Sequence, residues 1–294
     1  MRTFNLVMAA LILLPAVVAA QVRVVASTAD LAYFAREMGG DLVEVTAIAR
    51  PTADVHFVEV RPSYMMKVQR TDVVLKVGLE LDLWMDQIID GSRNSRQVIV
   101  DCSRYVEPLE VPDFKADARY GDLHQFGNPH YWLGPRNVKP ITDAIVEGLC
   151  EADPINIEKY RTNQSRFLSE LEAGLEKIEA KTAQLKGVEI ITYHNSWPYF
   201  CLFTGLRVAG FIEPYPGVPP SSTHVKKLTG QVRQRRIRVI GVEPYFDQRV
   251  PQKIAEETGA VVVTLYPSLG ARSQDESYLQ WLEANIDAIL GVLK

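Results

Sequence analysis

Short apolar runs alternate along the whole chain with longer stretches in which apolar residues recur at helical spacing. The apolar runs span 22–27, 43–48, 73–77 and 97–102 in the first half, and 189–194, 207–212, 237–242 and 261–265 in the second half. The helical stretches lie near 31–38, 79–89, 223–234, 251–257 and 278–293. Because strands that alternate with helices form parallel sheets covered by those helices, the pattern predicts an α/β protein with two parallel sheets.

The middle of the chain carries one long helical pattern between the two halves. From 155 to 185 the apolar residues Tyr160, Phe167, Leu171 and Ile178 follow helical spacing, and no proline interrupts the segment. A helix of about 30 residues would be about 45 Å long at 1.5 Å per residue. We therefore expect an N-terminal α/β lobe at 21–154, a linking helix at 155–186 and a C-terminal α/β lobe at 187–294.

The first 20 residues have the features of a secretory signal peptide. Arg2 precedes an apolar core from 6 to 18, and small residues follow up to Ala20. We expect cleavage after Ala20, a periplasmic location and no membrane insertion, because no other stretch approaches the ~20 apolar residues of a transmembrane helix. No cysteine follows the apolar core, so the sequence favours a free protein over a lipid-anchored one.

Charge and cysteine content narrow the possible functions further. A formal net charge of −4 and a pI of 5.8 argue against nucleic acid as a partner, since that requires clustered positive charge. The three cysteines, Cys102, Cys150 and Cys201, form no Cys-x-x-Cys pair, which leaves metal–thiolate ligation with little support. Their odd number allows one disulfide and a free thiol, or three buried thiols.

Three of the five histidines stand in settings that suit metal ligands. His130 lies between an Asn-Pro step and aromatic residues in the segment 127–135, so its backbone is stiff and Trp132 is close enough to exclude water. His56 lies in the polar loop after the predicted strand 43–48, and His194 ends the predicted strand 189–194. In open α/β sheets ligands bind at the carboxyl ends of strands, so His56 and His194 both lie on the side where a ligand is expected. The three histidines are too far apart in the sequence for a local zinc finger or a His-x-x-x-His pair, and their spacing alone does not show a shared site.

These segments resemble those of the zinc- and manganese-type periplasmic solute-binding proteins of ABC transporters, called cluster A-I or cluster 9. The family's Asn-Pro-His-x-Trp-Leu-x-Pro segment is matched at 128–135, its His…Glu…Pro segment by His56, Glu59 and Pro62, and its His-x-x-x-x-Tyr-Phe segment by His194, Tyr199 and Phe200. The resemblance implies two lobes joined by one spine helix, with a metal ion in the cleft between them. It also implies that metal capture orders cleft loops without a large closure.

One position departs from the family pattern. The resemblance implies a fourth ligand, an aspartate after the last strand, but Tyr266 stands at the corresponding place. A neutral phenol with a pKa of about 10 is a poor zinc ligand at pH 7. The fourth position is therefore open to water, Glu213, His224, His124 or Glu59, and the sequence does not choose among them. Asn128 and Asn195 are expected to orient the neighbouring histidines.

The histidines and the resemblance together predict a monomeric, non-enzymatic protein that captures Zn²⁺ and delivers it to an ABC permease in the inner membrane. Three imidazoles favour zinc over manganese, which takes more oxygen ligands. Two alternatives remain: an extracytoplasmic zinc hydrolase with a metal-bound water in the open position, and a metal chaperone or adhesin of the same fold. No His-Glu-x-x-His or Gly-x-Ser-x-Gly segment supports the hydrolase.

Overall fold

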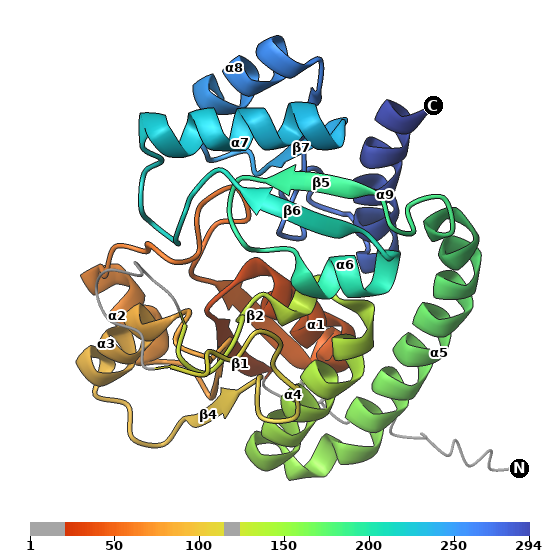
Figure 1. The fold of residues 1–294 in the computed structure, drawn as a ribbon. Coiled ribbons are helices and arrows are strands. Elements are labelled where there is room, and N and C mark those ends of the chain that lie inside the picture. Colours follow the sequence, from red (N-terminus) through yellow and green to blue (C-terminus); the bar gives the residue numbers. More distant parts are fainter. Residues whose placement is uncertain (1–20, 115–123) are drawn as a thin grey trace, which may run out of the picture.

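A computed structural model describes residues 21–114 and 124–294, so the expected signal peptide lies outside the described residues. The N-terminal lobe contains a parallel sheet in the order β2-β1-β3-β4 (Figure 1). Its elements are β1 (Val22–Ala26), α1 (Ala29–Gly39), β2 (Val43–Ala47), α2 (Pro62–Val68), β3 (Val73–Lys76), α3 (Leu83–Ser92), β4 (Val98–Asp101) and α4 (Val138–Ala152). The four predicted strands of this half are thus confirmed.

The C-terminal lobe repeats the same strand arrangement. Its parallel sheet has the order β6-β5-β7-β8, although the two halves of the chain show no evident sequence repeat. Its elements are β5 (Glu189–Thr192), α6 (Pro198–Thr204), β6 (Arg207–Phe211), α7 (Ser222–Arg235), β7 (Val239–Val242), α8 (Arg249–Thr258), β8 (Val261–Thr264) and α9 (Tyr278–Leu293). In both sheets the first strand lies between the second and third, and its carboxyl end is therefore a ligand-binding position.

One long helix, α5 (Ile157–Thr182), runs along one side of the molecule from the N-terminal lobe to the C-terminal lobe (Figure 1). Its 26 residues correspond to about 39 Å. It packs against α1 and α4 at one end and against α9 at the other. The predicted linking helix is present and shorter than expected at both ends: a single 3₁₀ turn at Pro154–Asn156 precedes it, and it ends at Thr182 before a series of turns.

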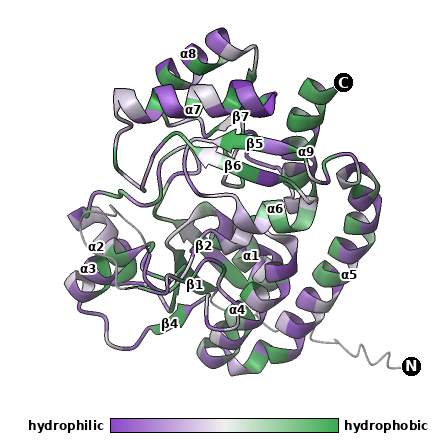
Figure 2. Cartoon of the chain, viewed as in Figure 1, coloured by the Kyte–Doolittle hydropathy of each residue, from purple (hydrophilic) through white to green (hydrophobic). Residues whose placement is uncertain are grey.

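The main hydrophobic core is continuous between the lobes. It includes residues of β1, β3 and α1, the buried face of α5, and Trp281 and Ile286 of α9. Figure 2 shows α9 hydrophobic along most of its length, because this helix lies between α5 and β8. A second, smaller core covers the other face of the C-terminal sheet beneath α7 and α8. Two lobes that share one core should move relative to each other only slightly.

Four helices differ from or add to the predicted set. The predicted helix at 79–89 begins later, at Leu83. The residues before it form a turn, because Gly78, Leu79 and Glu80 all have positive φ. The Asp82 carboxylate closes this turn by accepting hydrogen bonds from the Val77 and Gly78 amides. Helices α2 and α6, of seven residues each, and the 15-residue α4 were not predicted. Helix α4 packs closely on β4, where a side chain at Gly148 would meet Val100.

Two further observations concern the described residues as a whole. No helix there is long and apolar enough to cross a membrane. Cys102, Cys150 and Cys201 are all free thiols; Cys102 and Cys201 are buried, whereas Cys150 is only partly buried, so the expected alternative of three buried thiols holds for two of them.

Candidate metal centre

Three histidines from different parts of the chain converge between the lobes. His56 follows β2, His130 precedes the 3₁₀ turn Tyr131–Leu133 that leads towards α4, and His194 follows β5. Each offers one ring nitrogen, and these three atoms lie within 4.8 Å of one another. The ring centroids are 5.0 to 5.4 Å apart. Within the described residues, this is the one group of three or more histidine, cysteine or acidic side chains with metal-binding spacing.

The two N-terminal histidines are held by the same local device. Asp54 Oδ1 accepts hydrogen bonds from the His56 backbone N–H at 3.0 Å and from its Nδ1 at 2.8 Å. Asn128 Oδ1 accepts from the His130 backbone N–H at 3.1 Å and from its Nδ1 at 3.0 Å. Because these oxygens are acceptors, the proton of each ring is on Nδ1 and the Nε2 lone pair is free to bind a metal.

The C-terminal histidine is held by a residue far away in the sequence. Glu213 lies just beyond the end of β6, which pairs with β5, and its Oε2 accepts from His194 Nδ1 at 2.9 Å. The carboxylate is nearly as buried as the imidazole. This bond fixes the Nδ1–H tautomer of His194 and adds negative charge behind the ring, which makes Nε2 a better donor to a cation.

The surroundings favour the neutral forms of His130 and His194. Burial, followed by the neighbouring His56 and His194, places the pKa of His130 well below its ordinary 6.5. Burial also lowers the pKa of His194, although the hydrogen bond from Nδ1 to Glu213 opposes the change. Burial would raise the pKa of Asp54, but its hydrogen bonds and charge interaction with His56 reverse the direction and lower it. The site therefore combines neutral nitrogen donors with negative charge behind them.

Buried aromatic residues close the site on its inner side and tie the lobes together. The Trp132 ring lies 5.5 Å from that of His130, and its Nε1 donates to the Pro267 carbonyl of the C-terminal lobe at 2.8 Å. Trp197 and Ser196, which follow His194, both donate to Glu243 Oε1 at 2.9 Å. Trp132 is buried beside His130, as the sequence predicts.

A cavity of about 210 Å³ lies on the outer side of the site. Its lining includes His56, His194, Phe57 and Glu213, together with Pro216 and Gly217 of the loop after β6. The cavity therefore borders two of the three histidines of the site, His56 and His194. The acidic oxygens in its wall attract a cation.

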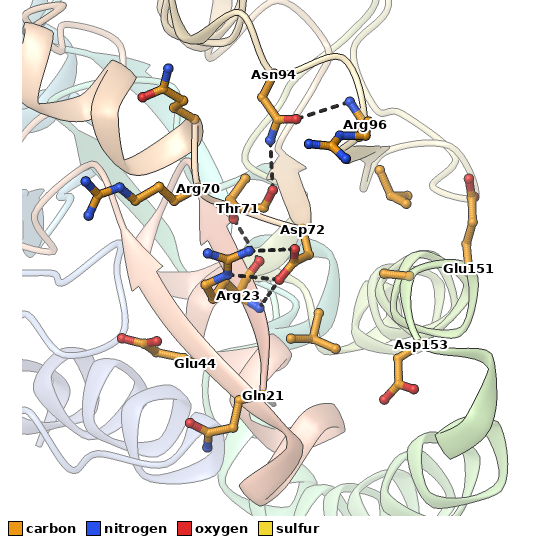
Figure 3. A pocket seen from close by; sticks show the side chains of 14 residues that line it. Gln21, Arg23, Glu44, Arg70, Thr71, Asp72, Asn94, Arg96, Glu151 and Asp153 are labelled. Carbon is orange, nitrogen blue, oxygen red and sulfur yellow. Dashed lines mark hydrogen bonds and ion pairs between the residues drawn. The ribbon is translucent and has the colours of Figure 1, made fainter. Parts of the chain in front are cut away.

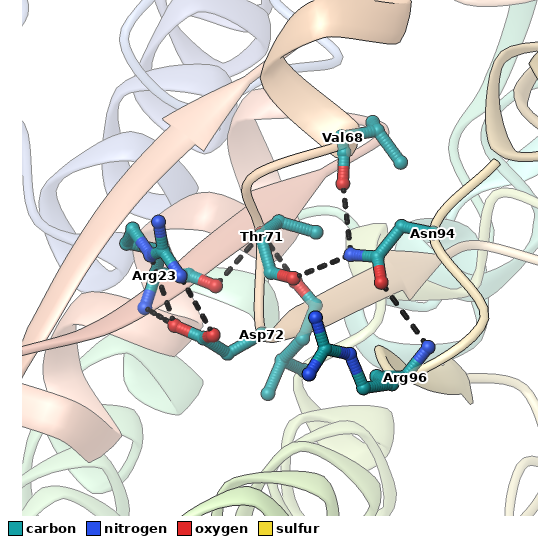
Figure 4. Close-up of polar contacts among 7 residues, drawn as sticks. Arg23, Val68, Thr71, Asp72, Asn94 and Arg96 are labelled. Carbon is teal, nitrogen blue, oxygen red and sulfur yellow. Dashed lines mark hydrogen bonds and ion pairs between the residues drawn. The ribbon is translucent and has the colours of Figure 1, made fainter. Parts of the chain in front are cut away.

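A larger hollow lies at the opposite, amino-terminal ends of β1, β3 and β4 (Figure 3). One pair of charged side chains in it is neutralised, because Arg23 Nε and Nη2 donate to both oxygens of Asp72. Thr71 donates to the Arg23 carbonyl, and Asn94 donates to the carbonyls of Val68 and Thr71 (Figure 4). These hydrogen bonds stabilise the ends of the strands. The three histidines lie at the opposite, carboxyl-terminal end of the sheet, so this hollow is not the metal site.

The sequence and fold match one known family. The model of the family described as "Zinc-uptake complex component A periplasmic" (ZnuA) matches residues 24–291. The chain belongs to this family. It is therefore a periplasmic divalent-metal-binding component of an ABC uptake system, and the family consists of solute-binding proteins, not enzymes. The zinc hydrolase alternative is thereby set aside.

Individual relatives of known description differ in the metal that they bind. The chain is 23% identical over 288 residues to the iron-binding protein YfeA of Yersinia pestis, covering 94% of this chain and 87% of YfeA. It is 24% identical over 268 residues to the high-affinity zinc uptake protein ZnuA of Bacillus subtilis, covering 87% and 82%. A crystal structure of ZnuA superposes with a TM-score of 0.81 at 25% identity, covering 93% of this chain and all of the other.

Most of the sequence's candidates for a fourth ligand are engaged elsewhere. Glu213 accepts from His194, and the His224 Nε2 lies 3.0 Å from the Phe211 carbonyl. Glu59 is exposed and paired with Arg61. The backbone of Tyr266 is bound to α9 through Asn285 and Trp281. His124 alone among these candidates stacks on a ring of the site, with its centroid 5.4 Å from that of His56.

Sequence reasoning placed some supporting residues correctly and missed others. Asn128 orients His130, as expected, whereas Asn195 donates to Glu110 and contacts no histidine ring through a hydrogen bond. Asp54 was missed, although Asp-Val-His56 repeats the spacing of Asn-Pro-His130 and could have revealed it. Glu213 was considered as a ligand, and its role as the partner of His194 required knowledge of the sheet.

Proposed function

We propose that this protein captures Zn²⁺ in the periplasm through His56, His130 and His194 and delivers it to an ABC permease of the inner membrane. The observation that carries the proposal is the convergence of three imidazoles whose Nδ1 atoms are all engaged, which leaves three Nε2 donors for one ion. Zinc accepts such donors at about 2.0 to 2.1 Å in tetrahedral geometry.

The donor set supports zinc over the other metals named among the relatives. Manganese and iron(II) usually take more oxygen ligands, whereas the three donors brought together here are nitrogens. Copper(II) and nickel(II) also bind imidazole well, so we expect both to compete with zinc in vitro. The metal in vivo is then set by availability in the periplasm as well as by the ligands.

The arrangement also suggests how cargo is retained and released. We assign His56 and His130 to an N-terminal lobe at 21–154 and His194 to a C-terminal lobe at 187–294, joined by a linking helix at 155–186 and preceded by a cleaved signal peptide at 1–20. A bound ion would link the two lobes. A small separation of the lobes on a permease would pull His194 away from the other two ligands and weaken the site.

The direct test is a zinc titration of the mature monomer in competition with a chromogenic chelator. Loss of a residue that only orients a ligand typically costs roughly tenfold or more in metal affinity. His130→Ala removes a ligand itself, so it should lower the zinc affinity by at least this factor. His224→Ala is the matched control, because this histidine binds a backbone carbonyl in the C-terminal lobe. Wild-type affinity in the His130 variant, or tighter binding of Mn²⁺ or Fe²⁺ than Zn²⁺ by the wild type, would contradict the proposal.

A further inference from the structure

A fourth histidine lies at the edge of the metal site with an unused ring nitrogen. The His124 ring stacks on that of His56 with an interplanar angle of 25° and is 7% exposed. Among the described residues, Nε2 of His124 and Nε2 of His56 are both buried and have no hydrogen-bond partner. Leaving such a buried nitrogen unpaired is costly, so two of them side by side indicate a shared partner that is a cation or a proton donor.

The chain around His124 is built to hold it there. The amide of Gly127 donates to the His124 carbonyl at 3.3 Å, and the amide of Gln125 donates to Glu80 Oε2 at 2.9 Å. Gly127 has φ of +105°, and a side chain there would meet Pro108 and the Leu109 carbonyl at 2.8 and 2.9 Å. This glycine therefore permits the tight turn between the site-facing histidine and the Asn-Pro-His130 segment.

The two ends of the loop that carries His124 are also joined. The amide of Asn128 donates to the Leu109 carbonyl at 2.7 Å, so the residues on either side of this segment are hydrogen-bonded to each other. Glu110 accepts from the side chains of Asn128 and Asn195 at this point. Because Asn128 orients His130, the base of the loop is fixed to the site itself.

We infer that His124 supplies the fourth ligand to the ion held by His56, His130 and His194, in place of the acid that is absent at position 266. The inference rests on the proposed function of that site. Its Nε2 is outside the group of three ligand atoms within 4.8 Å, so coordination requires the ring to turn from its stack on His56 towards the ion. Four neutral imidazoles complete a tetrahedral zinc site, and the carboxylates of Asp54 and Glu213 behind the rings offset its charge.

This ligand set has a consequence for metal choice. An acidic fourth ligand would add an anionic oxygen that manganese prefers, whereas a fourth imidazole favours zinc, copper and nickel. Position 124 is therefore a specificity-determining residue as well as a ligand.

The test combines ligand counting with affinity. X-ray absorption at the zinc edge of the loaded wild-type protein should fit four imidazoles, and His124→Ala should fit three imidazoles and one oxygen from water. The same variant should lose at least roughly tenfold in zinc affinity. Phe126→Ala is the matched control in the same turn, because this side chain is exposed, and it should leave both quantities unchanged.

A second variant separates ligation from packing. His124→Asp should retain more zinc affinity than His124→Ala and should bind Mn²⁺ more tightly than the wild type does, since it supplies an anionic oxygen. Three imidazoles in the wild type, or His124→Asp as weak as His124→Ala for both metals, would overturn the inference. If His130→Ala loses zinc while His124→Ala does not, only the fourth ligand is wrong; if neither variant loses zinc, the proposed site itself fails.

Discussion

The two lobes hold their metal-site histidines by different means. In the N-terminal lobe, a side chain two residues before each histidine accepts from both the backbone and Nδ1, as Asp54 does for His56 and Asn128 does for His130. In the C-terminal lobe, His194 depends on Glu213, which is 19 residues away and follows the neighbouring strand β6. The first device is local in sequence, and the second exists only once β5 and β6 have paired.

This difference has an energetic meaning. A local Asx-x-His turn can form before the sheets are complete, so it orients His56 and His130 independently of the lobe interface. The Glu213–His194 bond is buried, joins a charge to an imidazole and has no local substitute. Hydrogen bonds to charged groups contribute about twice as much as neutral ones, so His194 should be more sensitive to loss of its partner than His130, whose partner is neutral. The partner of His56 is also a carboxylate, but Asp54 is more exposed than Glu213 and belongs to a local turn, so His194 should be the more sensitive of these two as well.

The largest effect in this comparison is expected at Glu213. Glu213→Ala removes the acceptor and the charge behind His194, and should weaken zinc binding by roughly 100-fold, the upper end of outer-shell effects. Glu213→Gln keeps an acceptor and loses the charge, and should cost roughly tenfold. Asp54→Asn is the matched change in the N-terminal lobe, since it keeps the local turn. The zinc affinities of the three variants are measured by competitive titration. A larger loss of affinity for Asp54→Asn than for Glu213→Gln would show that the N-terminal ligand is the more sensitive one.

The same contrast explains what could be predicted from the sequence. Strands β1 to β8 are visible in the sequence as apolar runs. The residue that orients His130 lies in the same Asn-Pro-His130 segment. Both features could therefore be predicted from short stretches of sequence. Helix α4 also carries a readable signal, because Ile141, Ile145 and Leu149 recur at helical spacing, but Pro140 near its start obscured it. Proline is tolerated in a first helical turn.

Other features could not be read because they are made by tertiary contacts. The partnership of Glu213 with His194 follows from the order of strands in the sheet, which the chain does not state locally. The equal strand order of the two lobes is likewise invisible, because the two halves have no evident residue repeat. The position of His124 beside His56 depends on a loop whose two ends meet at Leu109 and Asn128.

A smaller effect is expected from pH, and it again separates the lobes. The pKa of His194 is lowered less decisively than that of His130, because the bond to Glu213 favours protonated His194 whereas the Asn128 partner of His130 is neutral. For a histidine with a pKa of about 6.5, the neutral fraction falls roughly tenfold between pH 7.5 and 5.5. Because the pKa values of His130 and His194 are lower than this, each of these ligands should contribute a smaller fall in zinc affinity over the same range.

The sign for stability follows from the same shifts. Because both pKa values are depressed in the folded protein, each neutral imidazole contributes stability above about pH 6.5 that is lost as the pH falls through its folded pKa. Proton NMR of the metal-free protein should show His194 protonating at higher pH than His130. If His130 protonates at higher pH than His194, or if both protonate at about pH 6.5, the proposed effects of Glu213 and of burial on these pKa values are wrong.

The smallest effect is expected where the two lobes meet at the surface. Glu110 is an exposed residue at φ of 55°, and its Oε2 accepts from Asn195 of the C-terminal lobe at 2.8 Å and from Asn128 of the N-terminal lobe at 3.2 Å. It thus connects the asparagine that orients His130 with the residue that follows His194. Glu110→Gln keeps an acceptor and weakens both bonds by removing the charge.

Because an exposed hydrogen bond contributes about 0.5 kcal/mol net, zinc affinity of the Glu110→Gln variant should fall only about twofold, mainly through faster dissociation. Glu107→Gln is the control, as this neighbouring acid is exposed and has no bond to either asparagine. Stopped-flow transfer of zinc to a chelator measures the dissociation rate. A loss as large as that of Glu213→Gln would mean that contact between the lobes at the surface limits retention of the ion more than orientation of His194 does.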